Sequence, residues 1–571
     1  MIATALTGLL RNIPRAALAP LRLLQRSRAC PPGAWVHLEI DGEVVEVHRA
    51  RKPQLPWAPK PTGLAIDRLR QLVDELLDDR SPGGLLVTIR SLSAGAAMRT
   101  AVRAELVRLR ASGRPVVVHL PLGGGPGELL VASAASRILL GMQTTLGPMG
   151  FAAGSFYLRR ALDKIGVQPD IHARGDFKTA GENLARDEMS GPQREQVGRL
   201  LDVMHDELVE ALREGRRVSR ETAAGWLDRG LIAAEDALRE GMVDALVHDD
   251  EALRSLGAVP RAEKVETAGA GAYLARRRQR VFTPVRPRPS IAIIEAHGPI
   301  VDKAPRAGGT FCDAVSLVKL IDAAAESKEV GGVVLHVDTP GGGVLASEKI
   351  HRAVSRLAQK KPIVASFGSV AASGGYYIAS GCHSIVARET TVTGSIGVVA
   401  ARVLVHPLLD RLGLRRDVIV RGAHADMFSP THPFDDAERA VFEAELERAY
   451  RHFLALVADG RHKRVDEIEP LAGGRVWSGR DAFERGLVDR LGGLETAVEE
   501  VRSRGKLPVG SEARVWRPAP KLTLRPLLDL MPWAVEAREA LGPWAALPDL
   551  GRALLVTREP FLALGWTWPG P

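Results

Sequence analysis

The sequence predicts an α/β fold that is built twice in tandem within one chain of 571 residues. Short apolar stretches such as RPVVVHL (114–120) and KPIVASF (361–367) alternate with amphipathic helical stretches, as they do in parallel βαβ units. The two halves also share landmarks at a constant spacing of 247 residues, as Gly147 and Gly394 illustrate. Because a chain of this length is too long for one core, we expect two domains from an internal duplication.

The matched elements follow one another in the same order in both copies. Each copy begins with a β-like stretch that ends in a glycine turn, followed by an amphipathic helix. A buried strand then runs into a tight loop, a second apolar strand follows, and a helical segment closes the match. The pairs are 35–46 with 290–301, 66–79 with 315–327, 83–95 with 331–343, 114–120 with 361–367, and 230–246 with 475–491.

Composition sets the remaining boundaries. Six Arg and three Pro fall between 276 and 289 without an acidic residue, which predicts a linker. Five of the nine Trp lie near the C-terminus, where they suit a membrane interface, an oligomer contact, or packing on the adjacent domain. The predicted order is a basic amphipathic segment (1–34), a first repeat (35–247), the linker (248–289), a second repeat (290–505) and a Trp/Pro-rich tail (506–571).

The first 30 residues contain five Arg and no acidic residue. The longest run without charge covers ten residues, whereas a bilayer-spanning helix needs roughly 20. The Arg residues also interrupt the continuous apolar stretch that a secretory signal would require. An interfacial amphipathic helix and a frayed basic terminus both remain open.

Charge and aromatic content indicate which partners to expect, and cysteine content indicates the redox compartment. The net charge of +9 and a pI near 9.6 permit attraction to an anionic surface. Aromatic residues make up only 5% and no nucleic-acid-binding fingerprint is present, so no nucleic-acid partner is expected. Three Cys without a C-x-x-C pair give neither a disulfide framework nor a zinc site, which fits a reducing compartment.

Ser373 is the candidate nucleophile. It lies in VAASGGYYIAS, where small neighbours let a substrate backbone approach and a helix start directs backbone N–H groups outward. The upstream DTPGGG (338–343) follows a buried strand, and its glycines can turn N–H groups towards a developing oxyanion. The first copy has Pro126 at the position of Ser373, and it also lacks the glycine run. A serine hydroxyl nevertheless needs a base to remove its proton.

Histidine and lysine are the two candidate residue types for that base. His336 lies on an apolar strand and His383 in a turn, and structural roles fit both better. Lys178 of the first copy aligns with Ala425 of the second, so the lysine is kept where the serine is lost. To act as a base, a lysine must be neutral, so its pKa must fall from about 10.4 towards 7–8. Taken alone, Lys178 fits an exposed surface lysine equally well, although complementary halves suggest one composite active site.

Several of these stretches resemble signal peptide peptidase A, a Ser/Lys protease family related to the Clp protease and crotonase folds. They are DTPGGGVLASE, ASGGYYIA and TGSIG, together with 162–190, which is similar to the lysine region of that family. The resemblance covers about 35–500 in the long tandem form. It therefore implies two tandem Clp/crotonase-like βαβ domains, with the serine in the second and the lysine in the first.

The resemblance also implies a role for each candidate residue. Ser373 would be the nucleophile and Lys178 the general base, and Ser395 of GSIG would be the hydroxyl that orients the lysine. Gly341 and the N–H of Gly374 would form the oxyanion hole, with the donor among glycines 341–343 left open.

The activity implied is that of a serine endopeptidase that cuts hydrophobic peptides, such as remnant signal peptides, and needs no metal or organic cofactor. The family assembles as homo-oligomers. Its long members usually begin with a transmembrane helix, and none is evident here. We therefore expect peripheral or weak attachment to a bacterial cell membrane, through residues 1–30 or the tail.

Two other functions remain as alternatives. The chain could be a catalytically silent scaffold or an oligomeric membrane-associated protein, because one copy has lost its serine. It could also be a crotonase-like acyl-CoA enzyme, although that chemistry has no use for a Ser/Lys pair. Peptide specificity, subunit number, and whether the dyad forms within one chain or between chains stay open.

Overall fold

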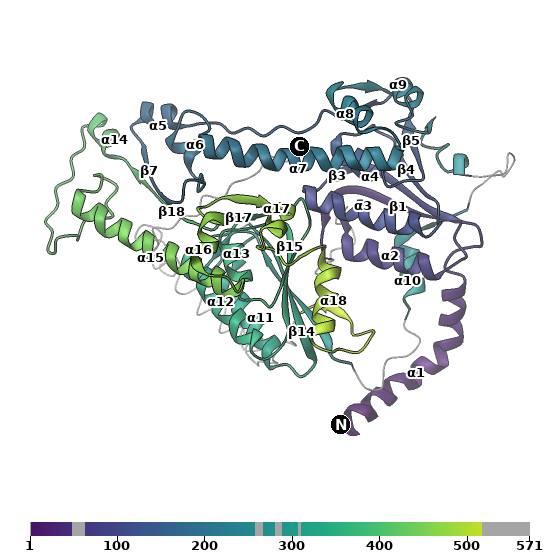
Figure 1. Cartoon of the computed structure of the whole chain (residues 1–571). Helices are drawn as coiled ribbons and strands as arrows, with labels where there is room; N and C mark the ends of the chain where they lie inside the picture. The colour runs from purple at the N-terminus through teal and green to yellow at the C-terminus, as the bar shows by residue number, and fades with distance from the viewer. Residues whose placement is uncertain (1, 48–62, 257–265, 280–287, 306–309, 517–571) are drawn as a thin grey trace, which may run out of the picture.

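The computed structural model describes residues 2–47, 63–256, 266–279, 288–305 and 310–516 (Figure 1). A helix, α1 (Ile2–Ser27), leads into two α/β domains that repeat one topology. The predicted α/β class and its duplication are therefore confirmed.

The first domain is built on a parallel sheet with the strand order β10-β1-β3-β4-β5-β9. The inner strand β4 is buried along its whole length, because side chains pack on both faces of a parallel sheet. The strands are β1 (Trp35–Val45), β2 (Gly63–Ala65) beside it, β3 (Gly84–Ser93), β4 (Val116–Leu120), β5 (Arg137–Gly141), β9 (Ala245–Val247) and β10 (Thr267–Gly269). The principal helices are α2 (Ile66–Asp78), α3 (Ala96–Ala111) and α4 (Pro126–Ala132).

The second domain repeats this order as β21-β11-β14-β15-β16-β20, again with parallel pairs. Its strands are β11 (Ser290–His297), β14 (Val330–Thr339), β15 (Ile363–Ala372), β16 (Ile385–Ala387), β20 (Arg490–Leu491) and β21 (Ala513–Val515). The corresponding helices are α11 (Ala314–Glu326), α12 (Val344–Ala358) and α13 (Gly374–Ala379), and α18 (Leu494–Arg504) packs on the other face of the sheet.

Short antiparallel pairs are repeated as well. In the first domain β6 (Thr145–Leu146) pairs with β8 (Ile232–Ala233), and in the second β17 (Val392–Gly394) pairs with β19 (Val476–Ser478). A minor pair joins β12 (Ile300–Val301) to β13 (Cys312–Asp313). The repeat therefore extends to elements of two or three residues.

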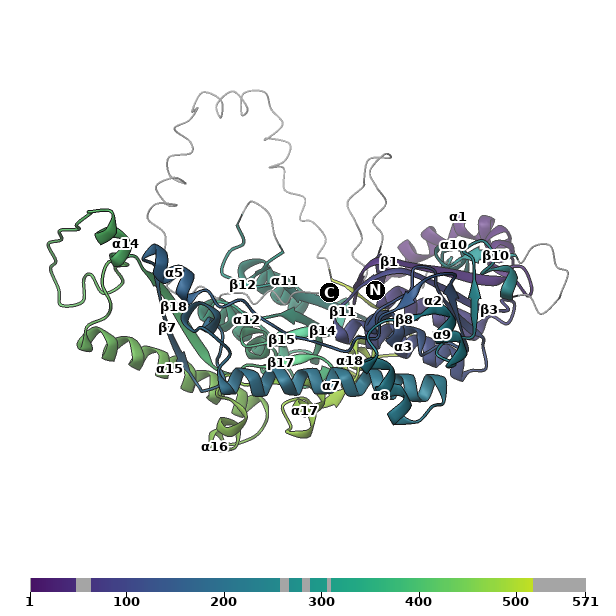
Figure 2. The same cartoon turned by 90° about the horizontal axis from the view of Figure 1, so that it is seen from above.

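An antiparallel strand pair joins the two domains. β7 (Gln168–Arg174) from the first copy pairs antiparallel with β18 (Val398–Leu404) from the second, and α5 (Arg159–Ile165) and α14 (His406–Arg411) lie beside this pair (Figure 2). The long helix α7 (Gly191–Arg216) runs across both domains, from α4 to β19, as both views show. These elements carry a segment of the first copy onto the second domain.

The remaining helices complete the two copies. They are α6 (Glu182–Ala185), α8 (Arg220–Asp228), α9 (Ala234–Arg239) and α10 (Ala270–Arg277) in the first copy, and α15 (Asp436–Gly460), α16 (Val465–Ile468) and α17 (Gly479–Glu484) in the second, with 3-10 turns at Arg254–Leu256 and Glu469–Leu471.

The predicted boundaries differ from the structure at two places. The segment predicted as a linker contributes β10 to the first sheet, and α10 buries Tyr273, whose hydroxyl donates to Asp79 (3.0 Å). Its Arg/Pro-rich end dominated the composition and obscured these short elements. The predicted tail begins with β21, which pairs with β11, and residues 517–571 lie outside the described residues. Among the described helices, none is both long and apolar enough to cross a membrane.

Candidate active site

Ser373 lies between the end of β15 and the first residue of α13. Its backbone has φ 53° and ψ −116°, a conformation that L-residues rarely adopt. The Ser373 N–H donates to the Gly394 carbonyl (2.8 Å), and its own carbonyl accepts from the Tyr377 N–H (2.9 Å). These bonds hold the hydroxyl at the start of the helix, as the sequence predicted.

Two buried tyrosines anchor the helix that follows Ser373. The Tyr376 hydroxyl donates to the Leu487 carbonyl (2.7 Å), and the Tyr377 hydroxyl donates to the carboxylate of Glu348. Both rings belong to the hydrophobic core of the second domain. The nucleophile is therefore mounted on a rigid element.

Lys178 follows β7 and is brought to Ser373 across the domain boundary. Its Nζ lies 3.0 Å from the Ser373 Oγ, 3.0 Å from the Ser395 Oγ and 3.0 Å from the Ser395 carbonyl oxygen. The side chain is buried, and this desolvation lowers the pKa of Lys178 from 10.5 to about 7. Lys178 thus meets two serines that lie 195 and 217 residues away from it in the same chain.

Backbone packing fixes the lysine loop on the second domain. The Phe177 N–H donates to the Gly473 carbonyl (2.9 Å), directly before the lysine. Gly474 has φ 80°, and a Cβ at this position would lie 2.4 Å from the Cβ of Lys178. A side chain at position 474 would therefore push the lysine loop away.

Gln196 of α7 ties the same loop to the second domain through its buried side-chain amide. Its Nε2 donates to the Thr179 Oγ1 (2.9 Å) and to the Phe177 carbonyl (3.3 Å), so it binds the residues on both sides of Lys178. Its Oε1 accepts from the Val476 N–H (3.1 Å) on β19. Sequence reasoning missed this residue, because nothing in its local pattern marks it.

Ser395 also has a left-handed backbone, with φ 51°. Its N–H donates to the Arg475 carbonyl (2.7 Å), and the Arg475 guanidinium stacks 4.4 Å from the ring centroid of Phe177. The loop of Ser395 and the loop of Lys178 are therefore fixed to the same short segment. This arrangement places both oxygens of Ser395 on the lysine amine.

The glycine loop lies against the start of α13. Gly341 has φ 106°, and a Cβ there would lie 2.7 Å from the Gly374 nitrogen. The Gly341 N–H donates to the Thr339 Oγ1 (3.1 Å), and the Gly343 N–H donates to the Ile300 carbonyl (3.0 Å). The N–H groups of Gly342 and Gly374 make no hydrogen bond to any described residue. Of the three loop glycines, Gly342 is thus the one with an uncommitted amide.

The position equivalent to Ser373 in the first copy and the position equivalent to Lys178 in the second copy do not form a second dyad. Pro126 begins α4, where the second domain has Ser373, and Ala425 is exposed at the position equivalent to Lys178. The two candidate histidines are held structurally, since His336 Nδ1 lies 3.1 Å from the Ser366 carbonyl and His383 Nδ1 3.2 Å from the Ile363 carbonyl. Across the described residues, no group of three or more His, Cys, Asp or Glu side chains could hold a metal ion.

Comparison with known proteins assigns both domains to one family. A family model described as Peptidase family S49 matches residues 108–260 and again 355–507, once in each domain. The chain belongs to peptidase family S49. It is accordingly a serine protease of the tandem type, with one S49 domain in each half.

Relatives extend the match over most of the S49 chain. Protease 4 of Salmonella typhi is 30% identical over 490 residues, which cover 82% of this chain and 78% of the relative. The chloroplastic serine protease SPPA of Arabidopsis thaliana is 29% identical over 457 residues, covering 79% of this chain and 67% of the relative. An Enterococcus faecium protein named as a signal peptide peptidase SppA is 39% identical over 183 residues, covering 32% and 53%.

A solved structure of a ClpP1 mutant from Listeria monocytogenes is matched at 12% identity with a TM-score of 0.23, covering 36% of this chain and 94% of that chain. The fold assignment of this S49 protease is carried by its two parallel sheets and by the family match.

Proposed function

We propose that the protein is an endopeptidase that uses Ser373 and Lys178 as a catalytic dyad formed within one chain. The observation that carries the proposal is the set of three 3.0 Å contacts around the Lys178 amine. A neutral amine has two N–H donors and one lone pair. If both N–H groups donate to Ser395, the lone pair faces the Ser373 hydroxyl, as a general base requires.

The reaction follows from this geometry. The Ser373 Oγ attacks the peptide carbonyl carbon while Lys178 takes the hydroxyl proton. The N–H groups of Gly342 and Gly374 receive the oxyanion, because both are uncommitted and adjoin the nucleophile. Lys178 then gives its proton to the leaving amine as the C–N bond breaks, and it activates the water that hydrolyses the acyl-enzyme. Gly341, expected from the sequence as a donor, instead shapes the loop.

Hydrophobic peptides are the proposed substrates. The support is the relative named as a signal peptide peptidase and the sequence resemblance to that family. A scaffold without activity is less favoured, since a buried lysine with a pKa of about 7 is costly to keep without chemistry. An acyl-CoA enzyme is less favoured because the dyad would have no role in it.

The test is peptide hydrolysis by the full chain and two single variants. A fluorogenic peptide with an apolar core and a polar peptide of equal length are compared. We expect cleavage of the apolar peptide, and a fall of at least about 10³-fold in kcat/KM for Ser373→Ala and for Lys178→Ala. Lys463→Ala, a lysine of the second domain that binds the Arg485 carbonyl, is the matched control and should retain activity. Equal rates for all three would refute the dyad.

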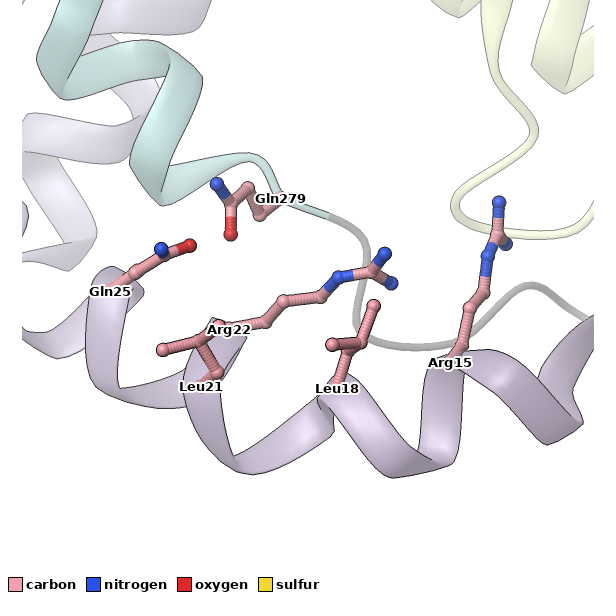
Figure 3. Close-up of a pocket in the computed structure, with 6 residues that line it drawn as sticks. All are labelled: Arg15, Leu18, Leu21, Arg22, Gln25 and Gln279. Carbon is pink, nitrogen blue, oxygen red and sulfur yellow. The ribbon is translucent and has the colours of Figure 1, made fainter.

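We also propose that α1 lies on an anionic membrane surface. It carries Arg but no acidic residue, and Leu23 and Leu24 are exposed. Figure 3 shows that the side facing the protein body lines a shallow pocket with Gln279. Flotation with vesicles containing anionic lipid should recover the protein, and Leu23→Glu should abolish recovery. Val509→Glu, an exposed apolar site on the second domain, serves as the control.

A further inference from the structure

Arg475 lies directly before β19 and connects the two segments that meet at the lysine amine. Its carbonyl oxygen accepts a hydrogen bond from the Ser395 N–H (2.7 Å), and its guanidinium carbon lies 4.4 Å from the ring centroid of Phe177. Phe177 precedes Lys178 in the chain, and both oxygens of Ser395 lie 3.0 Å from the Lys178 Nζ. One residue of the second copy therefore contacts both the lysine loop and the serine loop.

Further contacts hold the Arg475 guanidinium at this place. Its carbon lies 4.6 Å from the ring centroid of Trp477 on β19, so the planar cation stacks on two aromatic rings, one from each copy. The buried Trp477 ring is fixed in turn, because its Nε1 donates to the Leu471 carbonyl (2.9 Å). The Nη2 of Arg475 also lies 2.7 Å from the Glu195 carboxylate on α7. The side chain thus reaches two residues of the first copy.

Stacking is a stronger attachment here than charge pairing. The Glu195 side chain is 57% exposed, and ion pairs at such positions contribute little because water competes for both charges. The Arg475 side chain is only 20% exposed, and its Nε is buried without a hydrogen-bond partner among the described residues. Its flat faces on the two rings therefore carry most of the contact, and a lysine has no such faces.

The stack is present only where the dyad is present. The register of β19 on β17 matches that of β8 on β6, so Arg475 corresponds to Gly230 of the first copy. Phe177 corresponds to His424 of the second copy at the spacing of 247 residues. The position that lost the serine and the position that lost the lysine have therefore lost the stack as well. A requirement of the fold shared by both domains does not account for it.

We propose that Arg475 is a positioning residue, which stacks on Phe177 to hold the lysine amine against Ser373 and Ser395 and to exclude water from it. The inference rests on the proposed dyad of Ser373 and Lys178, and it adds the residue that fixes the geometry of that dyad. Arg475 acts through its two neighbours rather than on the reacting atoms. Without the stack, Phe177 and the lysine beside it can move relative to Ser395, and water can reach the amine.

Arg475→Lys tests the stack, because it keeps the charge but loses the planar guanidinium. We expect kcat for an apolar fluorogenic peptide to fall about tenfold with KM within about twofold of the wild type, since a displaced base slows the chemical step and leaves binding intact. Burial lowers the pKa of Lys178 to about 7, so water entering the site should move the midpoint of the pH profile above 7. An unchanged kcat and midpoint would overturn the proposal.

Arg485→Lys is the matched control. The Arg485 guanidinium carbon lies 4.3 Å from the same Trp477 ring, and this side chain binds Asp481 of its own copy. The variant should keep the wild-type kcat and midpoint. Glu195→Gln, which removes the ion pair alone, should keep kcat within about twofold. A loss as large as that of Arg475→Lys would assign the role to the ion pair and overturn the stack.

A double-mutant cycle with Phe177→Leu shows whether Arg475 acts through that ring. We expect each single variant to lower kcat about tenfold and the double variant to lower it no further, because the second change removes a contact that is already lost. Independent effects, which multiply to about 100-fold, would contradict action through Phe177. A lower melting temperature with a normal pH profile would show that Arg475 is structural only.

Labelling of Ser373 by a fluorophosphonate separates failure of this inference from failure of the dyad, because the reagent needs an activated serine and no peptide. The dyad stands if Lys178→Ala slows labelling at least about 10²-fold and Ser373→Ala abolishes it. In that case, a normal labelling rate and pH midpoint in Arg475→Lys refute this inference alone. If Lys178→Ala is labelled as fast as the wild type, the dyad fails and the inference fails with it.

Discussion

Two serines with unusual backbones define the site at the scale of single residues. Ser373 and Ser395 have φ values of 53° and 51°, and such conformations cost on the order of 1–3 kcal/mol each. The cost is tolerated because neighbouring carbonyls fix both residues, with Gly394 accepting from Ser373 and Arg475 accepting from Ser395. The strain directs both hydroxyls onto one amine.

The pH dependence of cleavage should follow the Lys178 amine. Burial lowers its pKa to about 7, and only the neutral form can accept the Ser373 proton. We expect kcat/KM to rise with pH, with a midpoint near 7 and a plateau above about 8, measured with a blocked peptide that does not titrate. A rate that is independent of pH between 5.5 and 9 would exclude Lys178 as the base.

Burial of Lys178 should also lower the free energy of unfolding at neutral and acidic pH. In the unfolded chain its pKa returns towards 10.5, so folding releases a proton between pH 7 and 10.5 and wild-type stability rises across that window. Lys178→Met removes the buried amine. The variant should exceed the wild type in thermal midpoint at pH 6, and the difference should shrink as the pH approaches 10. A constant difference across this range would contradict the low pKa.

At the scale of elements, α7 connects the lysine loop to the second domain through Gln196. Gln196→Leu should reduce kcat by about 10²-fold with little change in KM, because a small displacement of a base has effects of this size. Water entering the loosened loop should also move the midpoint of the pH profile above 7. Arg213→Ala, a surface change on the same helix, is the control. A variant with a normal profile and lowered stability alone would show Gln196 to be merely structural.

The repeated strands and helices could be predicted from the sequence, but the strand pair that joins the two domains could not. Apolar strands such as β4 and β15 are visible in the sequence because both of their faces are buried. The β7–β18 pair is not, since a strand pair between domains leaves no local pattern. Strands of two or three residues, such as β17 and β19, are too short to carry an alternation.

The candidate site divides in the same way. Ser373 could be proposed from its small neighbours and the glycine run before it, whereas Lys178 and Ser395 depended on a family resemblance. Gly474 and Gln196 could not be proposed at all. Their importance comes from packing against the lysine loop, which no spacing in the chain encodes.

At the scale of the whole molecule, a buried ion pair joins the two domains. Arg388 donates to both carboxylate oxygens of Glu46 at 2.8 Å, and neither side chain is more than 8% exposed. Burial alone would raise the pKa of Glu46, but the charge and hydrogen bonds of Arg388 outweigh it and lower the pKa. The pair therefore contributes stability above the ordinary pKa of a glutamate and loses it as pH falls.

Breaking this pair should be costly. Glu46→Gln leaves the Arg388 charge buried, and we expect a loss of about 3–5 kcal/mol, seen as a lower temperature for the first unfolding transition. Glu445→Gln, which breaks the exposed pair with Arg448, should cost less than about 1 kcal/mol. Similar midpoints for both variants would mean that the buried pair does not hold the domains together.

The pairing of β7 with β18 determines when the two groups can meet during synthesis and folding of the chain. During synthesis, residue 178 leaves the ribosome long before residue 373, and the amine has no nucleophile to activate. If Ser373 and Lys178 form the catalytic dyad as proposed, even a finished chain stays inactive until the second domain has folded and β18 has paired with β7, since the two groups meet only across that pair. Under the proposed dyad mechanism, peptide cleavage can therefore begin only after both domains have folded and β7 has paired with β18.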